Sequence, residues 1–179
     1  MMKYIAFLRG INVGGHNVIK MHDLKEMFVA MKFNNVHTYI QSGNVIFESS
    51  GTEVNSLGKK IQGRLLKAFG YSVEIFLRTM QEIEELIINN PFKDRELNNN
   101  IKLYVTFLSG EPGENQKQLI KDIDSISEMF EFGNKEIYCL RNKVLEADKP
   151  FLSTNYIERK IGLLATTRDW NTIKKVVEL

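Results

Sequence analysis

A short loop near the start of the chain combines the residue types best suited to chemistry. Its glycines give flexible backbone that a ligand can approach closely, and polar side chains stand among them. Backbone N–H groups of a glycine loop that runs into a helix N-terminus favour anions, and an arginine and a lysine add positive charge. The loop therefore predicts a site for an anionic or phosphorylated small ligand, formed by Arg9, Asn12, Gly14, Gly15, His16, Asn17 and Lys20.

Two other interpretations of this loop differ in how well the residues fit them. Gly10 and Gly15 have the spacing of a phosphate-binding P-loop. That motif needs Lys to reach the phosphates and Ser or Thr to hold magnesium, whereas His16 and Asn17 follow here, so it fails at both chemical positions. Glycine and asparagine also serve backbone conformations with positive φ, and a purely structural turn stays open.

Periodic apolar residues predict the elements that must position this loop. In the first half they indicate strands over residues 3–9, 36–40, 45–47 and 73–77, a helix after the loop, a second helix from 54 to 69 and a third after residue 79. This βαββαβ order is that of a ferredoxin-like unit. In such a unit the turn between the second and third strands lies at the same end of the sheet as the first loop. Gln41, Ser42 and Asn44 of that turn therefore join the candidate site.

The second half of the chain repeats the first, which indicates an internal duplication. Residues 4–10 match residues 104–110 at Tyr, Phe, Leu and Gly, and Tyr39 with Val45 recurs as Tyr138 with Val144. The second half is predicted to hold a helix over 114–130, a hairpin over 136–141 and 144–147, a helix over 153–161, a strand over 164–167 and a helix over 170–178. The predicted fold class is α+β, with two tandem ferredoxin-like repeats, each followed by an extra helix. The repeats span residues 1–92 and 101–179, and residues 93–100 connect them.

Both faces of the first predicted strand are apolar. Tyr4, Ala6 and Leu8 share one face, and Ile5 and Phe7 share the other. We therefore expect the face turned away from each repeat's own helices to be covered by the other repeat or by a second chain, so a homo-oligomer is one possibility.

Composition and charge narrow the class of protein. A formal net charge of +2 is too small to predict a nucleic-acid partner. The single cysteine, Cys139, cannot form an intramolecular disulfide, which fits a reducing cytoplasm. The chain has no leader pattern before Tyr4, and no apolar run approaches the roughly 20 residues of a membrane span. These features predict a cytoplasmic protein that does not enter membranes.

Other candidate sites fit their residues less well. His16, His22 and His37 lack the spacing of zinc ligands, so no metal site is predicted. Cys139 has no evident activating partner and is expected to be a buried hydrophobe. An RNA-recognition module shares the βαββαβ order, but the third strand lacks its basic and aromatic signature. The sequence predicts no particular cofactor.

Three stretches together resemble a bacterial family known only as a domain of unknown function, number 1697 in its series. They are residues 4–15, residues 39–47 and residues 165–172. The resemblance implies an α+β fold of ferredoxin-like halves and no assigned activity. It adds Arg168, Trp170 and Asn171 as residues of a characteristic motif, in which the family more often has Asn where this chain has Asp169.

The function is therefore unassigned, and three hypotheses stay open. The protein is an enzyme acting on a small phosphorylated or carboxylated molecule, a binding module for single-stranded nucleic acid, or a protein-interaction module without catalysis. A ligand in the glycine loop favours the first, salt-dependent oligonucleotide binding the second, and a large apolar patch the third.

Overall fold

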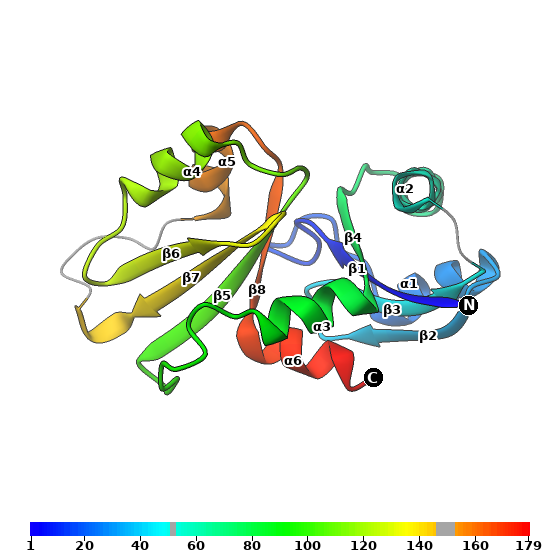
Figure 1. Ribbon diagram of the computed structural model, residues 1–179. Coiled ribbons are helices and arrows are strands. Elements are labelled where there is room, and N and C mark those ends of the chain that lie inside the picture. Colours follow the sequence, from blue (N-terminus) through cyan, green and yellow to red (C-terminus); the bar gives the residue numbers. More distant parts are fainter. Residues whose placement is uncertain (51–52, 146–152) are drawn as a thin grey trace. The chain divides into compact units, whose positions relative to one another are not determined.

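The structure is a computed structural model that describes residues 1–50, 53–145 and 153–179. Contacts within the chain divide it into two compact units, the first formed by Met1–Glu85 with Lys175–Leu179 and the second by Leu86–Lys174. Each unit contains one four-stranded antiparallel sheet (Figure 1). The predicted α+β class is thus confirmed. No helix in the described ranges is long and apolar enough to cross a membrane.

The elements of the first unit follow the predicted order. In chain order they are β1 (Met2–Leu8), α1 (Met21–Ala30), β2 (Asn34–Tyr39), β3 (Asn44–Ser49), α2 (Val54–Phe69), β4 (Ile75–Thr79) and α3 (Met80–Ile88), with the division between the units falling inside α3. The strand order in the sheet is β2-β3-β1-β4. β1 is therefore a central strand, and the loop that follows it starts from the middle of the sheet.

One face of this sheet forms a core with α1 and α2. Tyr4, Ala6 and Leu8 project to that face and pack with Phe28 of α1 and Ile61 of α2. The ring of Tyr4 stacks on Phe47 of β3, with centroids 5.6 Å apart. Period-two alternation in the strand and the apolar face of each helix explain this packing.

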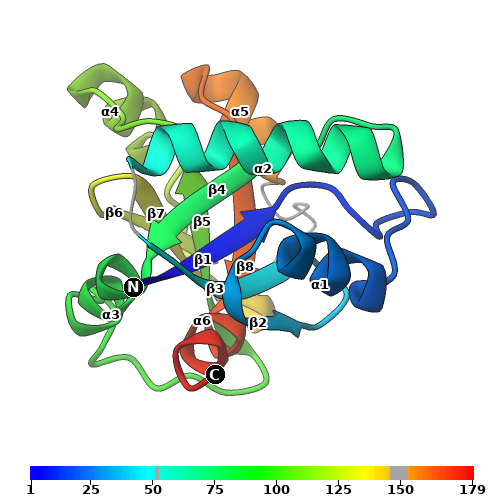
Figure 2. The ribbon, with the colours of Figure 1, turned by 90° about the vertical axis from the view of Figure 1, so that its right-hand side faces the viewer.

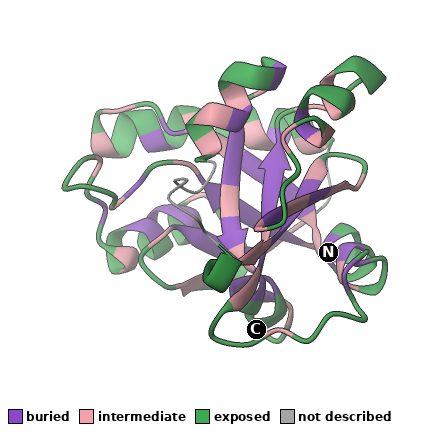
Figure 3. Ribbon diagram, turned by 90° about the vertical axis from the view of Figure 1, so that its left-hand side faces the viewer, coloured by how far each residue is buried: buried purple, intermediate pink, exposed green. Residues whose placement is uncertain are grey.

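The opposite face of β1 is also buried, because Ile5 and Phe7 have no exposed surface. Figure 3 shows that buried residues concentrate in the strands, while the helices keep exposed outer sides. What covers this second face stays a prediction.

The second unit has the same strand order. Its elements are β5 (Ile101–Leu108), α4 (Glu114–Lys121), β6 (Glu128–Phe132), β7 (Glu136–Asn142), the short 3-10 helix η1 (Lys143–Leu145), α5 (Thr154–Ile161), β8 (Ala165–Asp169) and α6 (Trp170–Val177), with the division between the units falling inside α6. The order in the sheet is β6-β7-β5-β8. α4 and α5 cover one face, where Ile120 and Ile157 pack with Phe130 and Cys139. Burial raises the pKa of the Cys139 thiol, so this cysteine is an inert core residue.

The predicted helix over residues 114–130 is wrong beyond Lys121. α4 ends there, and Phe130 lies in β6. Residues 136–141 are therefore the second strand of the hairpin and not the first. Val144 lies in η1, and residues 146–147 of the predicted partner strand fall outside the described residues.

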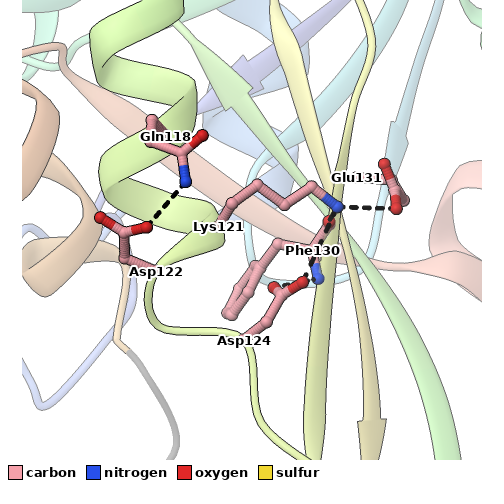
Figure 4. Close-up of polar contacts among 6 residues, drawn as sticks. All are labelled: Gln118, Lys121, Asp122, Asp124, Phe130 and Glu131. Carbon is pink, nitrogen blue, oxygen red and sulfur yellow. Dashed lines mark hydrogen bonds and ion pairs between the residues drawn. The ribbon is translucent and has the colours of Figure 1, made fainter.

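Side chains that bond the backbone explain why the helix stops (Figure 4). The Asp124 carboxylate accepts a hydrogen bond from the backbone N–H of Phe130 at 2.9 Å. The Ser125 hydroxyl accepts one from Glu128 N at 3.0 Å. Lys121 donates to the Phe130 carbonyl and pairs with Glu131 at 2.7 Å. Asp and Ser compete with helix bonding in this way, and here they turn the chain into a strand.

The proposed match of Tyr39 with Tyr138 is also wrong. Tyr39 ends β2, whereas Tyr138 lies inside β7, the strand that pairs with β5. Residues 4–10 and 104–110, by contrast, occupy the same topological position. Each begins in a central strand paired with the second strand of a hairpin and with the last strand of its sheet.

Candidate functional site

The β1–α1 loop forms a small hairpin that extends from the end of β1 (Figure 2). Val13 and His16 form an isolated antiparallel bridge, and His16 N donates to the Val13 carbonyl at 3.1 Å. Gly14 and Gly15 between them both have positive φ, 60° and 77°. Two left-handed residues in sequence define a type I′ turn, which glycine adopts without steric cost. The glycines therefore have a structural reason to be here.

The Asn12 side chain holds the base of this hairpin. Its Nδ2 donates to the carbonyls of Ile19 at 2.9 Å and Gln41 at 2.8 Å, and its Oδ1 accepts from Ile19 N at 2.8 Å. These bonds join the two ends of the loop and tie it to the β2–β3 turn. Asn12 itself has φ of 55°, a conformation that asparagine tolerates better than most residues.

The β2–β3 turn packs directly against the same loop. Gly43 has φ of 76°, and a Cβ placed on it would lie 2.5 Å from Cδ1 of Ile11. Only glycine fits this approach. Asn44 has no exposed surface, and its Nδ2 donates to the Tyr39 carbonyl at 2.9 Å and to the Ser42 hydroxyl at 3.2 Å. Ser42 and Asn44 thus shape the turn from within.

A tyrosine from a third segment also fixes the loop. The Tyr71 hydroxyl, just after α2, donates to the Val18 carbonyl at 2.9 Å. Topology places the segment after α2 at this end of the sheet, but no motif identifies Tyr71 as a partner of the loop. Ile11 was missed for a different reason, because a single apolar residue among polar ones gives no sign that it packs on Gly43.

The remaining predicted residues differ in their accessibility. Gly14, Gly15, His16, Lys20 and Gln41 are exposed, whereas Arg9 and Asn17 are partly buried. Asn17 contributes a long hydrogen bond of 3.5 Å from its Nδ2 to the Gly10 carbonyl. The structure therefore brings the loop and the turn together. Some of the predicted residues have exposed side chains or backbone, and others use their side chains in hydrogen bonds within the loop and the turn.

Helix α1 begins in this loop without a capping side chain. Lys20 occupies the N-cap position with extended backbone, and no side-chain hydrogen bond caps the helix there. Asn, Asp, Ser and Thr are the usual N-caps because their oxygens accept from the first-turn N–H groups, which lysine cannot do. Asp23 lies in the first turn, where a carboxylate interacts favourably with the helix dipole.

The motif at Arg168, Trp170 and Asn171 lies in the second unit. Arg168 is buried in β8, and its Nη1 donates to the Thr166 hydroxyl at 2.8 Å and the Thr167 carbonyl at 2.9 Å. Burial lowers the pKa of this guanidinium to about 10, so it stays charged at neutral pH. The Asp169 carboxylate accepts from Asn171 N at 2.8 Å at the start of α6. Trp170 is buried and Asn171 is exposed.

The fold and the loop together define an α+β protein with two four-stranded antiparallel sheets. Residues 1–138 match the model of a family described as "Protein of unknown function (DUF1697)", and the chain belongs to that family. The resemblance found in the sequence is thereby confirmed. Family membership assigns no function.

Two proteins are among those that a comparison with solved structures found. One is described as a conserved bacterial protein, SP0830, from Streptococcus pneumoniae; it has a TM-score of 0.70 and 22% identity, over 99% of this chain and 97% of that chain. At this identity the likeness shows a shared fold. The other, an unknown protein from Galdieria sulphuraria, has a TM-score of 0.27 and 12% identity, over 94% of this chain and 98% of that chain. No protein with a curated description matches the chain.

Proposed function

We propose that the β1–α1 loop binds an anionic or phosphorylated small ligand. The observation that carries this proposal is the uncapped start of α1, where Lys20 stands in the position normally taken by an accepting side chain. The first N–H groups of a helix need acceptors from side chains, water or ligands. An anion meets that need and also interacts favourably with the positive end of the helix dipole.

The rigidity of the loop supports the same proposal. Asn12 bonds the loop to itself and to the β2–β3 turn, and Tyr71 bonds it to the segment after α2. A pre-organised loop loses little conformational entropy on binding, so more of the contact energy becomes affinity.

The candidate residues then divide by role. Lys20 and Arg9 supply positive charge, His16 and Gln41 supply exposed polar side chains, and Gly14 and Gly15 supply accessible backbone. Asn12, Ser42 and Asn44 hold the loop and turn in place. Asn17, partly buried, helps to close the base of the hairpin. The proposal concerns binding and includes no reaction.

A protein-interaction role is the second candidate, and a different observation favours it. Val13 and Val18 are 64% and 65% exposed on either side of the hairpin turn. Single exposed hydrophobic residues are common, but two on one projecting hairpin suit contact with a partner protein.

At the level of the whole chain, we propose that the sequence contains two tandem ferredoxin-like repeats, each followed by an extra helix. The identical strand orders and the corresponding positions of residues 4–10 and 104–110 support this proposal. The repeats would span residues 1–92 and 101–179, with residues 93–100 connecting them. The single cysteine of the chain, Cys139, is buried and supports the proposal of a cytoplasmic location.

Amide NMR with inorganic phosphate as the probe tests the binding proposal. At constant ionic strength, we expect phosphate to shift the amide signals of Gly14, Gly15, Met21 and His22. Lys20→Gln should weaken the titration several-fold, and Lys25→Gln, which removes a charge further along α1, should not. Unchanged loop amides at millimolar phosphate contradict the proposal, as does equal binding by wild type and Lys20→Gln.

A further inference from the structure

A polar hollow in the second unit lies outside the loop discussed above. Its volume is about 230 Å³. Three segments form it: the connector before β5, the beginning of β5, and the end of β8 with the first half of α6. The lining residues are Leu97, Asn98, Asn99, Lys102, Leu103, Asp169, Trp170, Asn171 and Lys174.

Sheet register explains why these segments meet. Asp169, the last residue of β8, pairs with Tyr104 of β5. Because the strands are antiparallel, the chain leaves β8 beside the residues that precede Tyr104 and there enters α6. The connector is fixed by Asn98, whose Oδ1 accepts from Asn100 N at 2.8 Å and from Ile101 N at 2.9 Å. The hollow is thus held by a sheet, a helix and a bonded turn.

Two lysines from different elements line this hollow, and their positive charges favour an anionic ligand. Among the residues that the structure describes, neither the side chain of Lys102 in β5 nor that of Lys174 in α6 has a hydrogen bond or an ion pair. Their neighbour Lys175, in contrast, pairs with Glu178 at 2.7 Å. Lys102 is partly buried and Lys174 is exposed.

The other polar groups in the lining leave room for an anion. Asp169 is the carboxylate of the lining, and one of its oxygens already accepts from Asn171 N at the start of α6. The side-chain amides of Asn99 and Asn171 are exposed, and each can donate two hydrogen bonds. Two positive charges and two amides therefore face one negative charge.

The corresponding corner of the first sheet lacks these groups. With Tyr4 aligned to Tyr104, Met2 takes the place of Lys102, and Met80 after β4 takes the place of Trp170 after β8. Since the same strand order forms with methionines at these positions, the sheet does not require a lysine and a tryptophan there. The polar groups of the second unit need another explanation.

We propose that this hollow binds a small phosphate-bearing molecule, with Lys102 and Lys174 as its charge partners and Asn99 and Asn171 as hydrogen-bond donors. Lysine is a common phosphate binder, acting as a point charge on a flexible stem. The volume is below the roughly 300–1,000 Å³ of pockets for drug-sized ligands, so the occupant is smaller than a nucleotide. This proposal is independent of the one for the β1–α1 loop.

Tryptophan fluorescence tests the proposal at this site alone, because Trp170 is the single tryptophan of the chain. Inorganic phosphate, titrated at constant ionic strength, should change the Trp170 emission along a saturating curve. The double variant Lys102→Gln/Lys174→Gln should weaken that binding at least tenfold. Lys175→Gln, the matched control on the same helix, should bind as wild type does, and so should Lys20→Gln in the loop.

The outcomes separate the two sites. No saturating change in Trp170 emission overturns the proposal for the hollow, even where loop amides shift with phosphate. Equal affinity of the double variant and wild type also overturns it, provided that both unfold at the same temperature. Asp169→Asn sharpens the test, because it keeps an accepting oxygen at the start of α6 and removes the negative charge. It should therefore tighten phosphate binding a few-fold.

Discussion

The loops that follow the central first strands of the two sheets leave their sheets in the same way but differ in length and charge. Arg9 N donates to the Glu74 carbonyl at 2.9 Å, and Ser109 N donates to the Leu164 carbonyl at the same distance. The first loop then runs over residues 9–20 with Arg9 and Lys20, whereas the second needs only residues 109–113 and carries Glu111. Joining this strand to its helix therefore does not require the longer loop.

The starts of the two helices differ in the residue at the N-cap position. α4 has Glu114 in its first turn, and Gln116 accepts from the Gly113 N–H at 2.8 Å. α1 has Lys20 at its N-cap and no capping side chain. The Asp23 and Glu114 carboxylates both complement the positive end of their helix, and neither N-cap residue caps the first N–H groups with its side chain. The cation at the N-cap, Lys20 in place of Gly113, is therefore what distinguishes the start of α1.

Gly43→Ala should cause the largest loss of stability. It tests whether close packing of Ile11 in the β1–α1 loop requires glycine in the β2–β3 turn. A Cβ at this position meets Ile11, and the backbone has positive φ. We expect a loss of roughly 2–5 kcal/mol in the free energy of unfolding, from the left-handed conformation and the overpacking together. Urea denaturation measures this value.

Gly70→Ala is the matched control for that substitution. Its φ is 82°, but a Cβ there has no neighbour within 4 Å. It should cost about 1–2 kcal/mol from backbone conformation alone. Equal losses in the two variants would show that contact with Ile11 adds nothing. In the second unit the residue that accepts the corresponding strand bond is Lys135, so the shared fold does not require glycine at this position.

Asn12→Ala should follow in size, with a loss of about 1–3 kcal/mol, because it removes hydrogen bonds from two backbone carbonyls and one N–H. Asn17→Ala is the control, since Asn17 has a similar φ of 49° but only a 3.5 Å bond. Hydrogen exchange of the loop amides measures the local effect alongside thermal unfolding. If both variants lose the same stability, the Asn12 bonds do not hold the loop.

Thr167→Val should produce the smallest effect and compares the interiors of the two sheets. The Thr167 hydroxyl bonds those of Thr106 and Thr154, each at 2.8 Å, whereas Ala6 pairs with Leu77 at the position matching Thr106 and Thr167. We expect a loss of about 1 kcal/mol, because the buried Thr106 hydroxyl loses its partner.

The control for Thr167→Val is Thr38→Val in β2. Among the described residues the Thr38 hydroxyl has no hydrogen bond, so its removal should leave stability nearly unchanged. Chemical denaturation of both variants gives the comparison. A gain in stability in Thr167→Val would show that the hydroxyl chain weakens the second unit.

The sequence predicted those elements whose apolar residues follow a clear period. β1 formed where a short apolar run predicts a strand, and α2 formed where apolar residues at helical spacing predict a helix. The end of α4 was missed because Asp124 and Ser125 act through hydrogen bonds to residues in β6. Such bonds depend on where the chain returns, which local periodicity does not contain.

The candidate site was predictable in position but not in its internal roles. Topology placed the glycine loop beside the β2–β3 turn, and Asn12 bonds the Gln41 carbonyl there. Nothing local distinguishes Asn12, which bonds inward, from exposed loop residues such as His16. The hollow of the second unit was missed because Lys102 and Lys174 are far apart in sequence and belong to no shared motif.

The first unit contains residues from the start and from the end of the sequence, and this affects the order in which its parts are synthesised. Lys175–Leu179 belong to that unit, yet the ribosome adds them only after residues 86–174. Translation proceeds at about 5–20 residues per second, so roughly 5–20 s pass between synthesis of the N-terminal part of the first unit and synthesis of its last segment. The second unit is synthesised during this interval. Chaperones that bind exposed apolar surface during translation would therefore meet the first-made half of this protein in an unfinished state.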